Sequence, residues 1–341
     1  MAVDIPQLET GAGRGSTRKQ MQLGDDYFLG HGVQRSEQSA AYWYEKAANA
    51  GDPQAQLQIG FFYQVGIGVA RDPSRAAHWY QLASAGGSAT AKMNLGVAYL
   101  WGTGVPENKP LALQLFHEAV DKGCGMAAAY LGDAYALGFA VPKDLSTAEH
   151  WFAVGAKMHD PRSQFRLAAL VSSGTGSSQD LHKAAALLRD SGGKGYVPAK
   201  HALGLLLVNH PELATVPNEG LHALQESADA GTWKSSAALG ALARDGHGMT
   251  ADPKAAYRYF RIAQTEGGEE GRALVDVDVS LLKAKLSSGD VQALDQEAAT
   301  WVQKHPAVLE FVYKGAAPTF ALTAPNQQIH AGRLVPIPTD N

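Results

Sequence analysis

A period of 36 residues runs through most of this chain of 341 residues and limits its fold more than any other feature. A step of 36 from Gly24 meets a small residue each time, in the order Gly24, Gly60, Gly96, Gly132, Ala168, Gly204 and Gly240. An apolar residue precedes each of them, and no insertion disturbs the spacing. We call these seven positions the reference column and describe other columns by their offset from it. Such self-similarity is typical of repeat proteins, in which each repeat is one supersecondary unit.

Each repeat is predicted to contain two helices. Small and apolar residues recur at i, i+4 and i+8, as in Ala55, Ile59 and Tyr63, and this spacing marks one face of a first helix. We expect the small reference residue to let the backbone of a neighbouring helix approach closely. Glycines at offsets +6 and +8 end this helix in most repeats, because glycine readily adopts positive φ. Six repeats then start a second helix with a good N-cap residue at offset +12: Ser36, Asp72, Asn108, Asp144, Asp180 and Asp252.

The sixth repeat is the least regular. His210 stands at offset +6 and Val216 at offset +12, where the other repeats carry a glycine or an N-cap residue, and two prolines lie in the same loop. We therefore expect a distorted or longer loop near 209–218, with Asn218 capping a shifted second helix.

Composition excludes several classes of protein. Cys124 is the single cysteine, so no intrachain disulfide can form. The net charge is -4 and no basic stripe is present, which argues against nucleic-acid binding. No apolar run reaches the length of a membrane-spanning helix, so we expect no membrane insertion. Residues 1–15 lack the apolar core of a signal peptide, so we expect a cytoplasmic protein, or a periplasmic one if a leader has been removed.

The repeat pattern resembles a known family. The string from Leu95 to Val105 reads Leu-Gly-Val-Ala-Tyr-Leu-Trp-Gly-Thr-Gly-Val and is followed by Asn108, Ala112 and Phe116. It resembles the Sel1-like repeat, a relative of the tetratricopeptide repeat, and the resemblance extends over roughly 18–268. It implies an α/α superhelical adaptor that assembles protein complexes, often in bacteria. The family has no shared catalytic residues, so none is carried over.

These observations predict an all-α protein, a right-handed α/α superhelix of seven helix-turn-helix repeats with a C-terminal capping helix pair. We expect four regions: a flexible N-terminus (1–17), seven repeats (18–268), capping helices (269–305) and a proline-containing extended tail (306–341). The tail cannot be one regular helix because of its prolines. Part of it is expected to dock on the solenoid; the alternative is a disordered tail.

Stacked repeats offer an extended concave surface for binding. If the first helices line this surface, the residues that face it lie opposite the core face, at offsets -6, -2, +1 and +5. We call this set the first-helix stripe. The candidate partner-binding residues on it are Gln58, Phe61, Asn94, Trp101, Tyr130, Asp133, Arg162 and Arg166. The alternative is that these side chains are partly buried between neighbouring first helices.

Motifs that could carry chemistry are weak here. Ser191 to Lys194 and Ser16 to Lys19 both fit Ser-x-x-Lys, but the Ser-Asp-Asn and Lys-Thr-Gly of penicillin-recognising enzymes are absent. Asp276 and Asp278 look like a metal pair, yet 276 is the next step of the period, so an eighth first helix with exposed aspartates is favoured. The histidines lack the spacing of a metal site. We therefore expect that the chain binds no metal and no cofactor and that it is not an enzyme.

The sequence thus predicts a non-enzymatic scaffold or adaptor that binds a partner protein or peptide on its concave face. We expect it to be a monomer. One alternative is a fixed structural subunit of a larger assembly, and the other is a penicillin-recognising hydrolase.

Overall fold

The computed structural model describes residues 10, 12, 13, 15–176 and 178–305, together with the backbone of four strands after them. Most of the N-terminal region expected to be flexible (1–17) and much of the expected tail (306–341) lie outside the described residues. The chain divides into two compact units between Met158 and His159, and each unit is described by itself.

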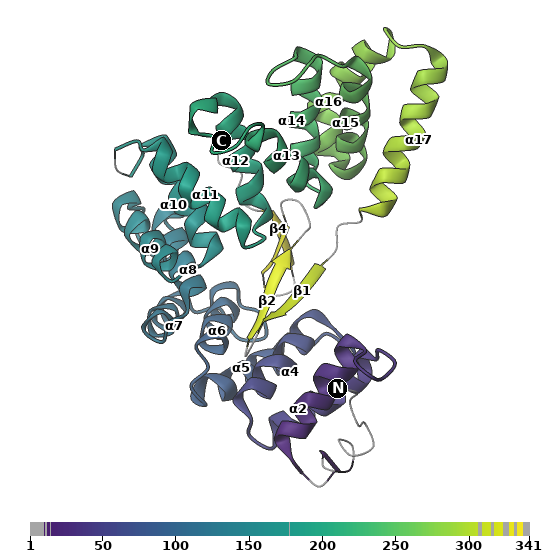
Figure 1. Cartoon of the computed structure of the whole chain (residues 1–341). Coiled ribbons are helices and arrows are strands. Elements are labelled where there is room, and N and C mark those ends of the chain that lie inside the picture. Colours follow the sequence, from purple (N-terminus) through teal and green to yellow (C-terminus); the bar gives the residue numbers. More distant parts are fainter. Residues whose placement is uncertain are drawn as a thin grey trace. The chain divides into compact units, whose positions relative to one another are not determined.

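The first unit contains four repeats, each a pair of antiparallel helices joined by a short loop (Figure 1). Its helices are α2 (Thr17–Leu29), α3 (Glu37–Asn49), α4 (Pro53–Val65), α5 (Pro73–Ala85), α6 (Ala89–Trp101), α7 (Lys109–Asp121), α8 (Gly125–Leu137) and α9 (Leu145–Lys157). Even-numbered helices are the first helices of the repeats and odd-numbered helices are the second. Each second helix packs on its own first helix, and α3, α5 and α7 also pack on the first helix of the next repeat.

The second unit continues the same order of elements. It contains α10 (Pro161–Ser173), α11 (Leu181–Gly193), α12 (Val197–Asn209), the short 3-10 helix η1 (Pro211–Leu213), α13 (Glu219–Asp229), α14 (Trp233–Asp245), α15 (Pro253–Glu266), α16 (Gly268–Lys283) and α17 (Ser288–Lys304). The expected all-α solenoid of repeats is therefore confirmed for the described residues up to 305. No helix among the described residues is both long and apolar enough to cross a membrane.

Four strands follow the helices. They are β1 (Leu309–Lys314), β2 (Ala317–Leu322), β3 (Gln327–His330) and β4 (Arg333–Pro336). β1 pairs with β2 and β3 pairs with β4, so the strands form two separate two-stranded sheets. The tail contains no regular helix among its described residues, in line with its prolines.

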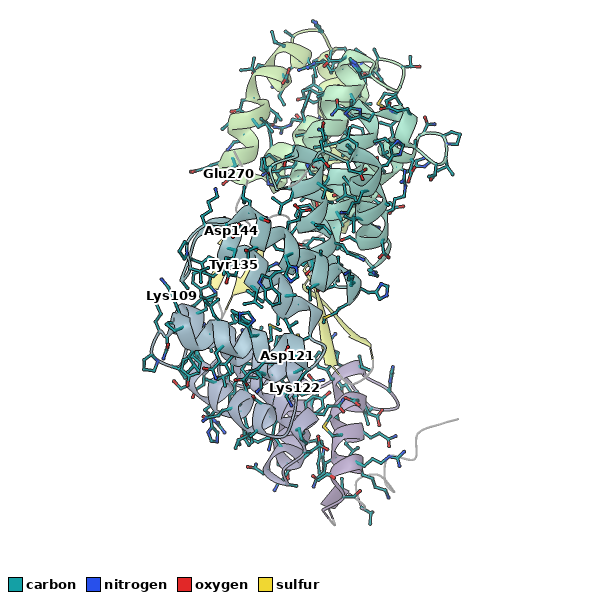
Figure 2. All side chains as sticks on the ribbon, turned by 90° about the vertical axis from the view of Figure 1, so that its left-hand side faces the viewer. Lys109, Asp121, Lys122, Tyr135, Asp144 and Glu270 are labelled. Carbon is teal, nitrogen blue, oxygen red and sulfur yellow. The ribbon has the colours of Figure 1, made fainter. Side chains whose placement is uncertain are left out.

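One backbone hydrogen bond closes the loop inside each regular repeat. The N–H of the residue at offset +12 donates to the carbonyl oxygen at offset +3, for example from Asp144 to Tyr135 at 2.9 Å, and Figure 2 labels both residues. The side chain of the same residue then caps the second helix, since Asp144 accepts hydrogen bonds from the backbone N–H groups of Ser146 and Thr147. The column that starts the second helix thus also fixes the loop before it.

The reference column makes room mainly for a side chain of the second helix, and less for a helix backbone than expected. A Cβ built on Gly132 would lie 2.4 Å from the ring of Phe152, and one on Gly60 would lie 2.8 Å from the ring of Tyr80. In these repeats the small residue therefore makes room for an aromatic side chain of the second helix in the same repeat. In the sixth repeat a Cβ on Gly204 would meet Leu224 and, at 2.9 Å, the backbone oxygen of Gly220, so the expected close approach of a helix backbone also occurs. The residues at this offset of +20 are Tyr44, Tyr80, Phe116, Phe152, Leu188, Leu224 and Phe260.

The second loop glycine joins one repeat to the previous one. A Cβ on Gly104 would lie 2.1 Å from the backbone oxygen of Pro73, where α5 begins, and Gly104 has a φ of +75°. Gly68 meets the carbonyl oxygen of Glu37 at the start of α3 in the same way. At Gly68 and Gly104 the backbones of two repeats thus touch, and a Cβ would require a local shift. The fourth repeat carries Ala140 at this offset with a φ of +67°.

The sixth repeat has the distorted loop that its sequence predicts. After α12, the η1 helix and a bend precede α13, whose N-cap residue Asn218 has a φ of +58° and makes no side-chain cap bond. Arg189 holds this loop, because its guanidinium donates to Glu219 at 2.6 Å and to the carbonyl oxygen of Leu213 at 2.5 Å. Asn218 therefore occupies the expected cap position without capping by its side chain.

Candidate functional site

The predicted partner-binding residues lie on four first helices. Gln58 and Phe61 are on α4, Asn94 and Trp101 on α6, and Tyr130 and Asp133 on α8, all in the first unit. The remaining two, Arg162 and Arg166, are on α10 in the second unit and are treated with that unit.

Most of these eight residues are buried among neighbouring helices. Gln58, Phe61, Tyr130, Asp133 and Arg162 are buried. Asn94 and Arg166 are half-buried and Trp101 is exposed. The ring of Tyr130 stacks on Phe116 of α7, with centroids 5.0 Å apart, inside a core cluster. This burial agrees with the alternative given above, in which the stripe residues lie between neighbouring first helices. Contact of the eight residues with a partner stays a prediction.

Asn94 is engaged within the unit. Its side chain hydrogen bonds to the hydroxyl of Tyr80, which donates to Gln64 Oε1 at 2.5 Å. Burial raises the pKa of Tyr80 well above its usual value near 10, so the phenol stays neutral. The cavity beside these groups has a volume of about 10 Å³, enough for one water molecule at most. Asn94 therefore serves the packing of the repeat in this structure.

In the first unit, the most consistently accessible position of the stripe is the last one, offset +5, at the C-terminal end of each first helix. In the first unit this position is apolar in every repeat; we call the set Leu29, Val65, Trp101 and Leu137 the apolar ladder. Leu29, Trp101 and Leu137 expose 45%, 47% and 50% of their surface, and Val65 is half-buried.

Ring contacts join the repeats beside the ladder. The ring of Trp101 lies 6.5 Å from that of Phe139, which is two residues past Leu137 in the loop of the next repeat. Phe28, next to Leu29, contacts Phe62 of the second repeat at 5.4 Å. The ladder is therefore set beside side chains that pack across repeats. Val65 and Trp101 belong to the stripe predicted from the sequence, and Trp101 alone of the four is a candidate partner-binding residue there. The apolar residue at one column of four successive repeats is a signal visible in the sequence.

The second unit lacks this ladder in its first three repeats. The same position carries Ser173, Asn209 and Asp245 on α10, α12 and α14. It becomes apolar again at Leu281 on α16, the eighth first helix, which is 58% exposed.

The motifs that suggested chemistry have structural explanations. Ser191 is fully buried, and its hydroxyl donates to the carbonyl oxygen of Pro161 at 2.6 Å. Lys194 bonds Asp190 at 2.8 Å and Gln164 at 3.2 Å, so this Ser-x-x-Lys offers no accessible nucleophile. The other motif places Ser16 just before α2.

The two aspartates of α16 point to different partners. Asp278 pairs with Arg244 at 2.5 Å, and Asp276 accepts from the side-chain amide of Gln264 at 2.5 Å. Val275 and Val279 on the same helix are buried, as the continued period predicted. Across the described residues, no group of three or more histidine, cysteine, aspartate or glutamate side chains could hold a metal ion.

Known proteins share this architecture. The Sel1 repeat family model matches residues 20–52, 53–88, 89–124, 125–160, 161–190 and 234–264. A Sel1 repeat protein from Oxalobacter formigenes is 30% identical with a TM-score of 0.58, over 63% of this chain and 89% of that one. A protective antigen of uropathogenic Escherichia coli with an SLR fold is 22% identical with a TM-score of 0.46, over 90% of this chain and 75% of that one. An immunity protein from Pseudomonas aeruginosa is 17% identical with a TM-score of 0.45, over 64% and 83% of the two chains.

The helical hairpins and their repeated glycines define an α-solenoid repeat protein. The family match covers more than half of the chain, which belongs to the Sel1 repeat family. The irregular sixth repeat is the one that the family model leaves unmatched. Sel1 repeat proteins generally act as scaffolds for protein interaction and not as catalysts. A search of curated proteins finds no match to this chain.

Proposed function

We propose that this chain is a non-enzymatic scaffold that binds a partner protein or peptide through the first-helix face of its first unit, anchored on the apolar ladder. First helices line the concave side in tetratricopeptide relatives, which is the side we expect the partner to occupy. The observation that carries the proposal is the exposure of Leu29, Trp101 and Leu137 at one repeated position.

Two physical arguments support this assignment. Packing across repeats explains only part of the ladder, because Leu29, Trp101 and Leu137 keep about half of their surface accessible. A partner would remove that apolar surface from water. Trp is also among the residue types that dominate the binding energy of interfaces. The ladder therefore replaces the buried residues of the stripe, such as Phe61 and Tyr130, as the proposed contact surface.

A matched pair of variants tests the ladder. We expect the double variant Trp101→Ala/Leu137→Ala to lose partner affinity by roughly 30-fold or more, since one hot-spot residue is worth about 2 kcal/mol. Tyr42→Ala is the control, because Tyr42 is a 53% exposed aromatic residue on α3, a second helix. Partners are captured from the native host with each immobilised variant and measured by quantitative mass spectrometry, after circular dichroism has shown equal helix content.

Two outcomes would count against the proposal. Equal capture by the ladder variant and by the wild type would remove the ladder as the anchor. Recovery of the native protein only within a large complex that never exchanges subunits would instead favour the alternative, a fixed structural subunit whose ladder is permanently covered.

A further inference from the structure

Helix α16 exposes the largest apolar side-chain fractions in the described part of the chain. Val277 is 72% exposed, Leu274 is 59% exposed and Leu281 is 58% exposed. They occupy offsets +1, -2 and +5 from position 276, which is the eighth step of the period. The terminal first helix thus carries an apolar stripe where α10, α12 and α14 carry mostly small or polar residues.

This helix has two distinct apolar faces. Val275, Val279 and Leu282 are buried against the rest of the second unit, with α15 as the main neighbour. Leu274, Val277 and Leu281 follow i, i+3 and i+7 on the opposite side, which places them on one exposed face. Three small exposed residues share that face and would allow a second helix to approach closely: Ala273, Ser280 and Ala284.

Opposite charges stand at the two ends of the exposed face. Glu270, labelled in Figure 2, lies in the first turn of α16, and Lys285 lies just past its last turn; both are exposed. Within residues 15–176 and 178–305, neither side chain forms an ion pair. Neighbouring charges on the unit are paired, as in Arg244 with Asp278 and Lys254 with Asp290 at 2.6 Å.

This arrangement is complementary to itself. If two copies of α16 pack antiparallel about a two-fold axis near Val277, Leu274 meets Leu281 of the partner subunit and Glu270 meets Lys285 of the partner subunit. A parallel pairing would instead oppose like charges. An interface with two-fold symmetry requires this kind of self-complementary patch.

We propose that the exposed face of α16 is a homodimer contact, in which a second copy of this chain packs its own α16 antiparallel across the stripe. This surface is separate from the apolar ladder and does not depend on the proposed partner binding. It replaces the monomer expected from the sequence alone. One helix pair covers less than the roughly 1,600 Å² of a standard stable interface, so the dimer is expected to be weak and dependent on concentration.

Charge exchange provides the first test. Sedimentation velocity of the full chain over a concentration series should show a monomer–dimer equilibrium that Val277→Glu abolishes. Glu270→Lys alone and Lys285→Glu alone should each weaken dimerisation by about tenfold, because each places like charges together twice in the symmetric dimer. The double variant should return to within about twofold of the wild type, since it restores both pairs.

The control is Leu205→Glu, at the same +1 column on α12 and 38% exposed, which should leave the equilibrium unchanged. A wild-type chain that stays monomeric at its highest soluble concentration overturns the proposal. So does a double charge variant that is as weak as either single variant.

Cross-linking provides the second test and locates the contact. In a Cys124→Ser background, Val277→Cys should form a disulfide-linked dimer under mild oxidation, because Val277 lies near the proposed axis. Leu205→Cys should not. Equal cross-linking of the two variants would mean random collision and would contradict the antiparallel α16 contact.

Discussion

The two units present different chemistry at the same repeat positions. At offset +5 the first unit carries Leu29, Val65, Trp101 and Leu137, whereas α10, α12 and α14 of the second unit carry Ser173, Asn209 and Asp245. The columns that build the hairpin change far less, since the N–H at offset +12 bonds the carbonyl at offset +3 in both units. Columns that hold the backbone are thus constrained, and columns that only face outward are free to acquire a binding role.

The buried columns differ as well. At offset -3 the first unit carries apolar or small residues, among them Met21, Leu57 and Met93. In the second unit α10 and α14 do the same, with Phe165 and Ala237, whereas α12 carries His201. His201 Nδ1 lies 2.8 Å from Ser235 Oγ, and Ser235 donates to Ser227 Oγ at 2.9 Å. Part of the helix packing in the second unit therefore uses hydrogen bonds where the first unit uses apolar contacts.

The largest predicted difference between the units concerns the second loop glycine. Gly104→Ala should destabilise the first unit by about 3 kcal/mol or more, because the new Cβ would lie 2.1 Å from the backbone oxygen of Pro73 and φ is +75°. Gly248→Ala in the second unit should be destabilising by only about 1 kcal/mol, since its φ is +67° but nothing lies within 4 Å. Urea denaturation followed by circular dichroism measures both.

Gly248 is the internal control for this experiment, because it shares the strained φ and lacks the close contact. Its missing neighbour follows from the sixth repeat, where α13 begins only at Glu219 after the distorted loop. Equal losses of unfolding free energy in the two variants would show that positive φ alone explains the glycines at offset +8. The predicted difference between the two units would then be wrong.

The reference column provides a second, smaller contrast. Gly132→Ala should destabilise the first unit by about 2 kcal/mol, since the new Cβ would overlap the ring of Phe152. The fifth repeat, in the second unit, already carries Ala168 with Leu188 at offset +20. The double variant Gly132→Ala/Phe152→Leu copies that pair and should recover part of the loss. A double-mutant cycle on urea midpoints measures the coupling, and strictly additive losses would contradict it.

The start and end of each helix in the hairpins could be predicted because they depend on residues close in sequence. Glycines that end helices and N-cap residues such as Asp72 and Asp144 act within a few residues, so their spacing is visible in the sequence. The ring that fills the space above Gly60 lies twenty residues away, and its column of aromatic residues was present but was not connected with the glycine. A steric pair of this kind is recognised only when both columns are compared.

The accessibility of the first-helix stripe was less predictable than the helix ends. A helical wheel gives the direction of Phe61 or Tyr130 relative to the helix axis, but it does not say which neighbouring helix covers them. In the first unit, offset +5 near the helix end is the position that most often escapes that cover. The exposed face of α16 was hard to predict for a different reason: Asp276 and Asp278 resemble a metal pair, whereas the informative residues are the apolar ones beside them, Leu274, Val277 and Leu281.

The smallest predicted effect is a dependence of folding stability on pH, which His201 at offset -3 gives to the second unit. Burial lowers the pKa of His201 to about 4, so the unfolded chain binds more protons between pH 6.5 and 4 and the stability of the second unit falls as the pH falls through that range. At pH 5.5 the loss relative to pH 8 should be about 1 kcal/mol. His201→Met, which installs the residue found in the first and third repeats, should remove this loss, and urea midpoints at the two pH values measure it.

The comparison must use the difference between variant and wild type, because Glu266 acts in the opposite direction. Burial raises the pKa of Glu266 to about 8, so its contribution to stability is greatest below pH 4.5 and disappears as the pH rises through 8. Subtraction cancels this term, since Glu266 is present in both proteins. Hydrogen exchange should localise the effect of His201→Met to α12–α14 and leave the first unit unchanged. A pH response of the same size in both proteins would mean that His201 is not the group that makes the second unit sensitive to acid.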